Sequence, residues 1–386
     1  MMLRRMQRLR RLPFIRLGAF AIVAAGLALV GSSFGATKSP HSRSADKKFV
    51  IGVLYPYIIN DGGYATVNTA YLQQAINAVG KDRFEVRGVE NVPYTQQATQ
   101  TALQLFQQGV DIEIDFLASG QLFYDACKQV PDKMCIEDFP PTGTPIPSNV
   151  LAFRYERAPL NYLKGVAAGM LTKTGTVGFL SSFKLGFNTA DLNSFALGCR
   201  SVRPNCVVRN IYINSFNNPP KSVEAAKTLL NVKADVLAHT LDDPSGIKVA
   251  AARGVWVFGD YANQSSLFAS RWVTGSNYGP AVLPILVQQL RKVLDGSWKG
   301  SATPIHASKP APTGDLYPWG KNVPKSVRTK VDALKTAMRA GKFNPYCGPL
   351  RDTTGKVRLA KGRCIGLQSD FLFDGWNWFV KGVVGG

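Results

Sequence analysis

Short apolar runs alternate with longer segments of helical periodicity along most of the chain. The strand-like runs are Phe49–Tyr55, Phe84–Val89, Ile112–Leu117, Val150–Phe153, Thr176–Leu180, Val207–Ile213, Val236–His239 and Val255–Phe258. Helical spacing of apolar residues covers Thr66–Val79, Thr95–Gln108, Pro159–Leu171, Thr189–Cys199, Ser222–Val232, Pro280–Leu294 and Pro324–Ala340. Strands that alternate with helices in this way predict an α/β protein built on parallel sheets.

The chain is too long for one core of this type, so two lobes are expected. We expect the break near Phe153–Pro159 and a return crossing near Trp272–Tyr278. The predicted domains are a first lobe of residues 47–154 with about 276–300, a second lobe of 155–275, and a C-terminal extension of 301–386 packed on the lobes. Two similar lobes joined by several crossings form a hinge, and their cleft can close on a ligand.

The first residues have the pattern of an export signal. Several arginines precede an apolar run from about Leu17 to Val30, and small residues surround a cut near Gly35. We therefore expect a signal peptide over 1–35, a flexible stub over 36–46 and a periplasmic protein. The apolar run is short for a transmembrane helix, although an uncleaved anchor stays open as an alternative. The general and twin-arginine export routes are both left open.

The chain is basic, with 46 Lys and Arg against 25 Asp and Glu and a formal charge of +21. These basic residues are scattered along the chain, whereas nucleic-acid binding is typically signalled by a basic cluster or helical stripe. A general effect on solubility and encounter accounts for the charge, so no nucleic-acid partner is expected.

The cysteines fall into three close pairs, and an even number in an exported chain suggests disulfides. Each pair brackets a short polar or turn-rich segment, so nearest neighbours are the preferred partners, although spacing alone leaves other pairings open. The pairs are Cys127 with Cys135, Cys199 with Cys206, and Cys347 with Cys364. The last pair is expected to close a short hairpin at the end of the chain. None has Cys-x-x-Cys spacing, and only three histidines are present, which argues against a metal site.

Two loops carry the candidate binding chemistry. Asp61-Gly62-Gly63-Tyr64 follows the first strand, and the polar loop 214–220, with Phe216 in its middle, follows a strand of the second lobe. Ligands of open α/β sheets bind at the carboxyl ends of the strands. Two aromatic rings across a cleft can sandwich a flat molecule while carboxylates and amides bind its edge. An ordinary turn is an equally good interpretation of the second loop.

Catalytic motifs give no consistent pattern. Ser181 and Lys184 lie after Lys173-Thr174-Gly175, which reverses the order found in active-serine β-lactamases. His239 stands near Asp242 and Asp243 without a visible nucleophile. We predict no enzyme activity; an exported enzyme acting on nucleosides or related heterocycles and a periplasmic sensor domain are the alternatives.

Several motifs together resemble a known family. They are Asp61–Tyr64, Tyr155–Arg157, Leu163–Gly169, Gly175–Phe179 and Asn193–Gly198, followed by Gly348–Asp352, Gly355–Val357 and Trp376–Val383. Their order and spacing resemble the basic membrane protein family of ABC-transporter substrate-binding proteins. That group includes purine-nucleoside and purine-base binders, and the tail looks like the purine-base branch.

The resemblance implies a type I periplasmic-binding-protein fold, a small-molecule ligand, an ABC permease as partner, a monomer, no catalysis and no cofactor. Tyr64 and Phe216 stand where the family usually carries tryptophan, and Asp242 or Asp243 matches its acidic position. The stretch from Gly259 to Gln264 departs from the family's aspartate pattern, which favours a base-like ligand over a ribose. The candidate binding residues are Asp61, Tyr64, Phe116, Asn193, Phe216, Asp242, Asp243 and Asp260.

Overall fold

A computed structural model of the protein describes residues 47–268, 270–306 and 310–385. The predicted signal peptide, 1–35, and the stub, 36–46, lie outside these residues. Within the described ranges no helix has both the length and the apolar character needed to cross a membrane.

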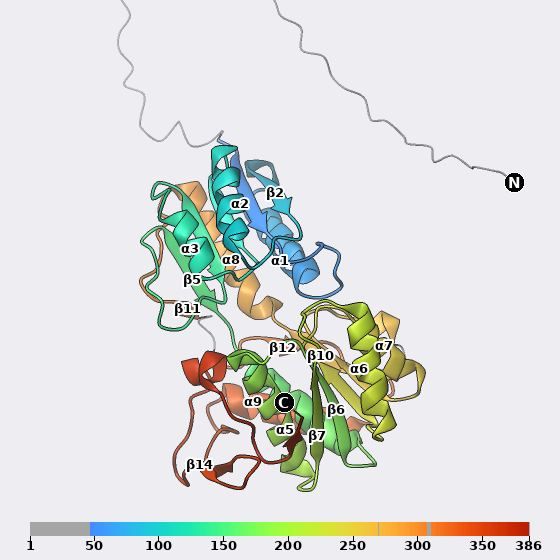
Figure 1. The fold of residues 1–386 in the computed structure, drawn as a ribbon. Coiled ribbons are helices and arrows are strands. Elements are labelled where there is room, and N and C mark those ends of the chain that lie inside the picture. Colours follow the sequence, from blue (N-terminus) through green and yellow to red (C-terminus); the bar gives the residue numbers. More distant parts are fainter. Residues whose placement is uncertain (1–46, 269, 307–309, 386) are drawn as a thin grey trace, which may run out of the picture. The chain divides into compact units, whose positions relative to one another are not determined.

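The first lobe is built on a sheet in which every neighbouring pair of strands is parallel. Its order is β11-β5-β4-β3-β1-β2. The strands are β1 (Phe49–Leu54), β2 (Phe84–Val89), β3 (Ile112–Asp115), β4 (Met134–Asp138), β5 (Val150–Arg154) and β11 (Ile305–His306). Its helices are α1 (Tyr64–Val79), α2 (Gln96–Gln107), α3 (Gln121–Cys127) and α8 (Gly279–Asp295). Ile51 shares a core with α1 and α8, whereas Leu54 shares one with α2 and α3, so helices cover both faces of the sheet (Figure 1).

The second lobe repeats this arrangement with the strand order β12-β10-β9-β8-β6-β7-β15. The strands are β6 (Thr176–Ser181), β7 (Val207–Tyr212), β8 (Val236–His239), β9 (Trp256–Gly259), β10 (Trp272–Asn277), β12 (Asp315–Leu316) and β15 (Val383–Val384). Only the pairing of β10 with β12 is antiparallel among these described strands. The helices are α4 (Ala158–Leu171), α5 (Gly186–Val202), α6 (Pro219–Asn231) and α7 (Ser245–Ala252).

The chain beyond β11 contributes to the second sheet at both of its edges, through β12 and β15. Between these strands lie α9 (Lys325–Arg339), the hairpin of β13 (Leu350–Arg351) and β14 (Val357–Leu359), and a π-helical turn, η4 (Phe371–Gly375). Since β11 belongs to the first sheet and β12 to the second, the chain crosses between the lobes here too, a crossing that the sequence analysis did not foresee.

The parallel sheets expected from the sequence are confirmed, but several elements were missed, among them two strands and two helices of the lobes and the two-residue strands β11, β12 and β15. β4 reads Met-Cys-Ile-Glu-Asp and β10 reads Trp-Val-Thr-Gly-Ser-Asn, so neither presents an uninterrupted apolar run. α3 and α7 have only 7 and 8 residues, which is too short for a clear helical period.

The disulfides join the nearest-neighbour pairs preferred from the sequence. Cys127–Cys135 ties the end of α3 to β4, and Cys199–Cys206 ties α5 to the start of β7. Cys347–Cys364 closes the segment that carries the β13–β14 hairpin, as expected.

Helices α4 and α5 approach each other through glycines. A Cβ atom on Gly165 would lie 2.0 Å from the carbonyl oxygen of Phe195, and one on Gly198 would lie 2.0 Å from that of Tyr162. These glycines belong to the motifs on which the family resemblance rests. Their small size therefore serves helix packing, and it fixes the spacing of the polar side chains that α4 and α5 present to each other.

We expect Gly198→Ala to lower the free energy of unfolding by about 1–3 kcal/mol, because the added methyl group overpacks the α4–α5 contact. Gly366→Ala is the matched control, since a Cβ atom there meets nothing within 4 Å. Urea denaturation followed by circular dichroism measures both. Equal stability of the two variants would contradict the packing role.

Candidate functional site

A cavity of about 200 Å³ lies between the loops at the carboxyl ends of the strands of both lobes. We call it the interlobe pocket. Its lining residues are Pro56, Tyr64, Tyr94, Leu117, Ala118, Phe139, Pro140, Pro141, Arg157, Phe187, Phe216, Asp242, Tyr261, Phe373 and Asp374. Aromatic side chains from both lobes and from η4 are therefore the largest group in the wall, and only three of the lining side chains are charged.

Three of the residues predicted from the sequence line this pocket. Tyr64 comes from the first lobe, at the start of α1, while Phe216 and Asp242 follow β7 and β8 of the second lobe. The backbone N–H of Asp242 donates to the carbonyl oxygen of Phe216 at 2.8 Å, so the two loops of the second lobe are joined.

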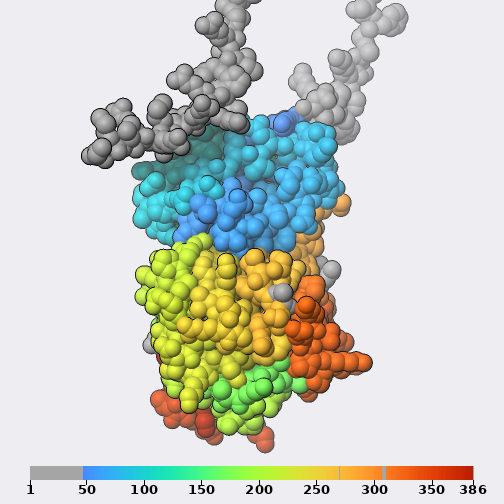
Figure 2. Space-filling view, turned by 90° about the vertical axis from the view of Figure 1, so that its right-hand side faces the viewer, coloured from blue at the N-terminus to red at the C-terminus, as the bar shows by residue number. Residues whose placement is uncertain are grey.

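The ring of Tyr64 is held from both lobes. Its hydroxyl donates to Asp138 Oδ2 at 2.8 Å, and its ring meets Tyr261 of the second lobe edge-on, with centroids 5.2 Å apart. A Cβ atom on neighbouring Gly63 would lie 2.3 Å from the carbonyl oxygen of Asp242. The loop before Tyr64 therefore lies directly against the second lobe, and the lobes are closed on each other. Figure 2 shows the blue first lobe meeting the yellow-green and yellow second lobe on one face.

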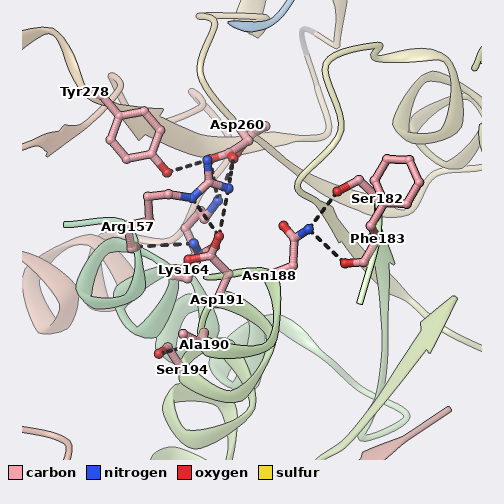
Figure 3. Close-up of polar contacts among 12 residues, drawn as sticks. Arg157, Lys164, Ser182, Phe183, Asn188, Ala190, Asp191, Ser194, Asp260 and Tyr278 are labelled. Atoms are coloured by element: carbon pink, nitrogen blue, oxygen red, sulfur yellow. Dashed lines mark hydrogen bonds and ion pairs between the residues drawn. The ribbon is translucent and has the colours of Figure 1, made fainter. Parts of the chain in front are cut away.

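Phe216 belongs to a cluster of phenylalanines. Its ring is nearly parallel to that of Phe187, with centroids 6.4 Å apart, and Phe183 meets it edge-on at 5.1 Å. Asn188 Nδ2 fixes the preceding loop by donating to Ser182 Oγ and to the carbonyl oxygen of Phe183, as Figure 3 shows.

The other five predicted residues do not line the pocket, because each carries out a structural task elsewhere. The Asp61 carboxylate accepts the backbone N–H groups of Gly63, Ala65 and Thr66 and so caps α1. Phe116 is fully buried and packs edge-on against Tyr64 from behind.

Polar residues among these five have internal partners. Both ends of the Asn193 amide bind the tail, at the carbonyl oxygen of Trp378 and the N–H of Val380. Asp243 accepts the N–H of Ser245 at the start of α7. Asp260 is buried in an ion-pair network. None of these side chains is therefore among the residues that line the interlobe pocket in this structure.

The most important residue that the sequence analysis missed is Arg157. Its guanidinium carbon lies 5.0 Å from the ring centre of Tyr261, 5.4 Å from Phe187 and 5.8 Å from Phe139. A cation surrounded by ring faces is stabilised by their quadrupoles. Its position in Tyr155-Glu156-Arg157, at the crossing between the lobes, was the signal that could have identified it.

Arg157 is held by a buried network of charges (Figure 3). Its guanidinium lies 2.7 Å from Asp191 Oδ2 and 3.5 Å from Asp260 Oδ2. Lys164 Nζ lies 3.3 Å from Asp260 Oδ1, which also accepts the Tyr278 hydroxyl at 3.1 Å. Burial alone would raise the pKa of Asp260, but the charges of Lys164 and Arg157 hold it below its ordinary value. Two cations and two carboxylates thus balance each other beside the pocket.

Three residues of the pocket wall have a positive φ angle although they are not glycine. Phe139 has φ 60°, Tyr261 has φ 56° and Ala118 has φ 54°, and each closely follows a strand. Such conformations cost of order 1–3 kcal/mol each and concentrate at binding sites. The backbone turns sharply at these positions, where the chain leaves the strands for the pocket wall.

His239 is not part of the pocket wall. It is buried, and burial lowers its pKa to about 4, so the imidazole is neutral at physiological pH. Because His239 does not line the cavity, it is not placed to act on a molecule in the interlobe pocket.

Buried carboxyl groups lie behind Tyr64 in the first lobe. Burial raises the pKa of Asp138 to about 8, with the hydrogen bond from Tyr64 opposing the shift. Burial also raises the pKa of Asp115, at the end of β3, to about 6. Between the pKa of an unfolded aspartate and these values, the folded protein holds protons that the unfolded chain releases. Stability must therefore fall as pH rises through this window.

We expect Asp138→Asn to reduce the loss of melting temperature between pH 5 and pH 8, because asparagine does not titrate and can still accept the Tyr64 hydroxyl. Part of the decrease in melting temperature with pH should remain, because Asp115 still titrates in this range. Melting curves at a series of pH values measure the effect. Asp332→Asn, on the exposed face of α9, is the control and should keep the slope of the parent protein. An unchanged slope in Asp138→Asn would refute the assignment.

Comparison with known proteins places the chain in a family. Residues 50–303 match the Bmp family model, described as ABC transporter substrate-binding protein PnrA-like. A purine-binding protein of Brucella abortus is 25% identical over 342 residues, covering 88% of this chain and 94% of that protein. A putative ABC transporter glucose-binding protein of Haloferax volcanii is 26% identical over 305 residues, covering 76% of this chain and 71% of that protein.

Solved structures confirm the predicted periplasmic-binding-protein fold with two Rossmann-like lobes. An ABC transporter solute-binding protein from Conexibacter woesei has a TM-score of 0.59 at 22% identity, covering 77% of this chain and 98% of that chain. One from Aeropyrum pernix has a TM-score of 0.63 at 13% identity, covering 78% and 94%. The family match extends from β1 to just before β11, and it confirms the resemblance read from the motifs. The chain therefore belongs to the Bmp family of PnrA-like ABC transporter substrate-binding proteins.

Proposed function

We propose that this protein is exported to the periplasm and serves as the solute-binding component of an ABC importer for a small planar heterocycle, a purine base or a nucleoside-like compound. The observation that carries the proposal is the wall of the interlobe pocket, in which aromatic rings from both lobes surround a cavity with few charged groups.

The size and lining of the cavity favour a flat aromatic ligand. An apolar cavity of about 150 Å³ accommodates benzene, so about 200 Å³ has room for a small ring system. Tyr64 and Phe216 stack on the ligand, and Phe187, which also lines the pocket, lies nearly parallel to Phe216. A sugar needs hydrogen-bonding groups around its whole edge, whereas this wall has three charged side chains among apolar and aromatic ones. This balance favours a purine over the glucose named for the Haloferax relative.

Asp242 recognises the edge of the ligand. Its side chain is buried, and burial together with the charge of Asp61 raises its pKa well above the ordinary value. The group accepts ring N–H donors when ionised and donates to a ring nitrogen when protonated. Either bond forms in an environment that excludes water, where an unpaired polar group is costly.

Closure of the lobes is coupled to binding because the ligand contacts both. Gln264 Nε2 donates to the carbonyl oxygen of Gly62 at 3.0 Å, and the N–H of Phe216 donates to the Tyr57 hydroxyl at 3.4 Å. A bound ligand adds its own contacts with both lobes to these hydrogen bonds. It therefore shifts the population towards the closed form. The closed, monomeric protein then delivers the ligand to a membrane permease.

A thermal-shift screen tests the class of ligand. Purine bases and nucleosides should raise the melting temperature in proportion to the logarithm of their concentration, since they bind the folded state alone. Glucose at the same concentrations should leave it unchanged. A shift with glucose and none with purines would reverse the assignment, and conversion of a nucleoside, detected by chromatography, would favour the enzyme alternative.

We expect Tyr64→Ala to weaken binding of the best purine by roughly 5- to 150-fold, because a stacked base contributes about 1–3 kcal/mol. Tyr64→Phe keeps the ring and loses only the hydrogen bond to Asp138, so its affinity should stay within about fivefold of the parent. Isothermal titration measures both.

Leu267→Ala is the matched control for these titrations, because Leu267 is an exposed apolar residue on the second lobe and does not line the pocket. It should bind like the parent protein. Unchanged affinity in Tyr64→Ala would remove Tyr64 from the binding site.

A further inference from the structure

The interlobe pocket has a wall that lies outside the family-matched region. Phe373 and Asp374, in η4, line the cavity although the match ends at residue 303. We call residues 367–380 the strap. In Figure 1 its red π-helical turn lies at the end of the second lobe that faces the first, and it contacts α5.

The strap is fixed firmly to the second lobe. Asn193 of α5 binds it at the carbonyl oxygen of Trp378 (2.7 Å) and the N–H of Val380 (2.9 Å). Close to η4, a Cβ atom on Gly186 would lie 2.1 Å from the carbonyl oxygen of Asp374. The backbone of the strap thus rests against the start of α5, where no larger residue than glycine fits.

The strap also contacts residues at the strand ends of the first lobe and at the start of the crossing to the second lobe. Arg154, the last residue of β5, forms an ion pair with Asp370, and its guanidinium carbon lies 4.3 Å from the ring centre of Phe373. The ring of Phe373 stacks on Phe139, with centroids 5.4 Å apart and planes 17° from parallel. Gln368 Nε2 donates to Glu156 at the first crossing, at 2.6 Å. Closure of the lobes therefore brings Phe139 and Arg154 against the strap.

The charge that the strap adds to the pocket is negative. The positive charge of Arg157 is neutralised by the carboxylates of Asp191 and Asp260. Asp374 is an exposed residue of the wall, and its Oδ1 lies against the first residue of α5. Its carboxylate can accept N–H donors from a ligand and repels ligands that carry a negative charge.

We infer that the strap is a third wall of the binding site, in which Phe373 covers the ligand and Asp374 selects neutral or cationic heterocycles with N–H donors over anionic ones. This inference rests on the proposed function, because it specifies which planar ligands the same pocket accepts. Phe373 contributes contact area to every flat ligand, whereas Asp374 discriminates between ligands by charge. A strap that only stabilises the fold would show no such discrimination.

The test compares two flat bicyclic probes of similar size. Adenine is neutral and carries an amino group, and urate is an anion at neutral pH. Dissociation constants of both are measured by isothermal titration for the parent protein and for Asp374→Asn, Phe373→Ala and Tyr64→Ala. Glu224→Gln is the control, since it removes an exposed carboxylate of α6 that does not line the pocket.

The parent protein should bind adenine more tightly than urate. Asp374→Asn should reduce this preference by about tenfold, the scale of one charge-assisted hydrogen bond. Phe373→Ala should weaken adenine binding at least about fivefold, because the stacking contact is lost. Glu224→Gln should keep the preference of the parent. Asp374→Ser provides a second neutral variant if the asparagine fails to fold.

Three outcomes overturn the inference, and they differ in what they say of the proposed function. If Tyr64→Ala weakens adenine binding while Asp374→Asn leaves the preference for adenine over urate unchanged, the strap does not select the ligand. The proposal of a purine receptor is then unaffected. If neither probe binds the parent protein, the purine assignment fails and the inference with it. An equal loss of both probes in Asp374→Asn would reduce the strap to a structural role.

Discussion

The buried charge of Arg157 is the constraint around which this binding protein is organised. An ionised guanidinium away from water is tolerated only when counter-charges and hydrogen bonds surround it. Asp191 supplies one from α5 and Asp260 another from the loop after β9, while Lys164 of α4 balances the second carboxylate. Removing one partner of such a set leaves an unpaired buried charge, which costs about 3–5 kcal/mol. The start of α4, the interior of α5 and the end of β9 are therefore held in one arrangement.

That arrangement depends on how closely the helices approach. Asp191 can reach Arg157 because α4 and α5 touch backbone to backbone at Gly165 and Gly198. The same network extends to the hinge, since Tyr278 donates to Asp260 and packs beside Tyr155, with ring centres 5.0 Å apart. The two crossings between the lobes that contain Tyr155 and Tyr278 are thus in contact with each other, and Tyr278 is bonded to the ion-pair network beside the pocket. The ion-pair partners of Arg157, and the rings of Phe187 and Tyr261 around it, belong to the second lobe.

The sequence predicted those parts of the molecule that depend on local pattern. Tyr64, Phe216 and Asp242 were found because each follows a strand end, and parallel strands bring their carboxyl ends to one edge. Asn193 and Asp260 have internal partners here, and in sequence such a polar residue looks like one that faces a ligand. Phe139 was missed with its strand, since the acidic residues of β4 hide the apolar pattern. The positive φ angles of Phe139 and Tyr261 have no signal in residue type, because tertiary contacts impose them.

Phe373 illustrates a different limit of sequence reasoning. It lies far along the chain from the other wall residues, and nothing in its neighbourhood connects it with the pocket until the tail is seen to return through Asn193 and β15. Its place in the wall also changes the energetics of closure. In a receptor with two lobes alone, the closed form is stabilised by contacts between the lobes and with the ligand. Here Phe139 and Arg154 contact a strap that is fixed to the second lobe. If the lobes close on a ligand, as proposed, this part of the closing surface is already ordered, and such pre-organisation reduces the entropy lost on binding.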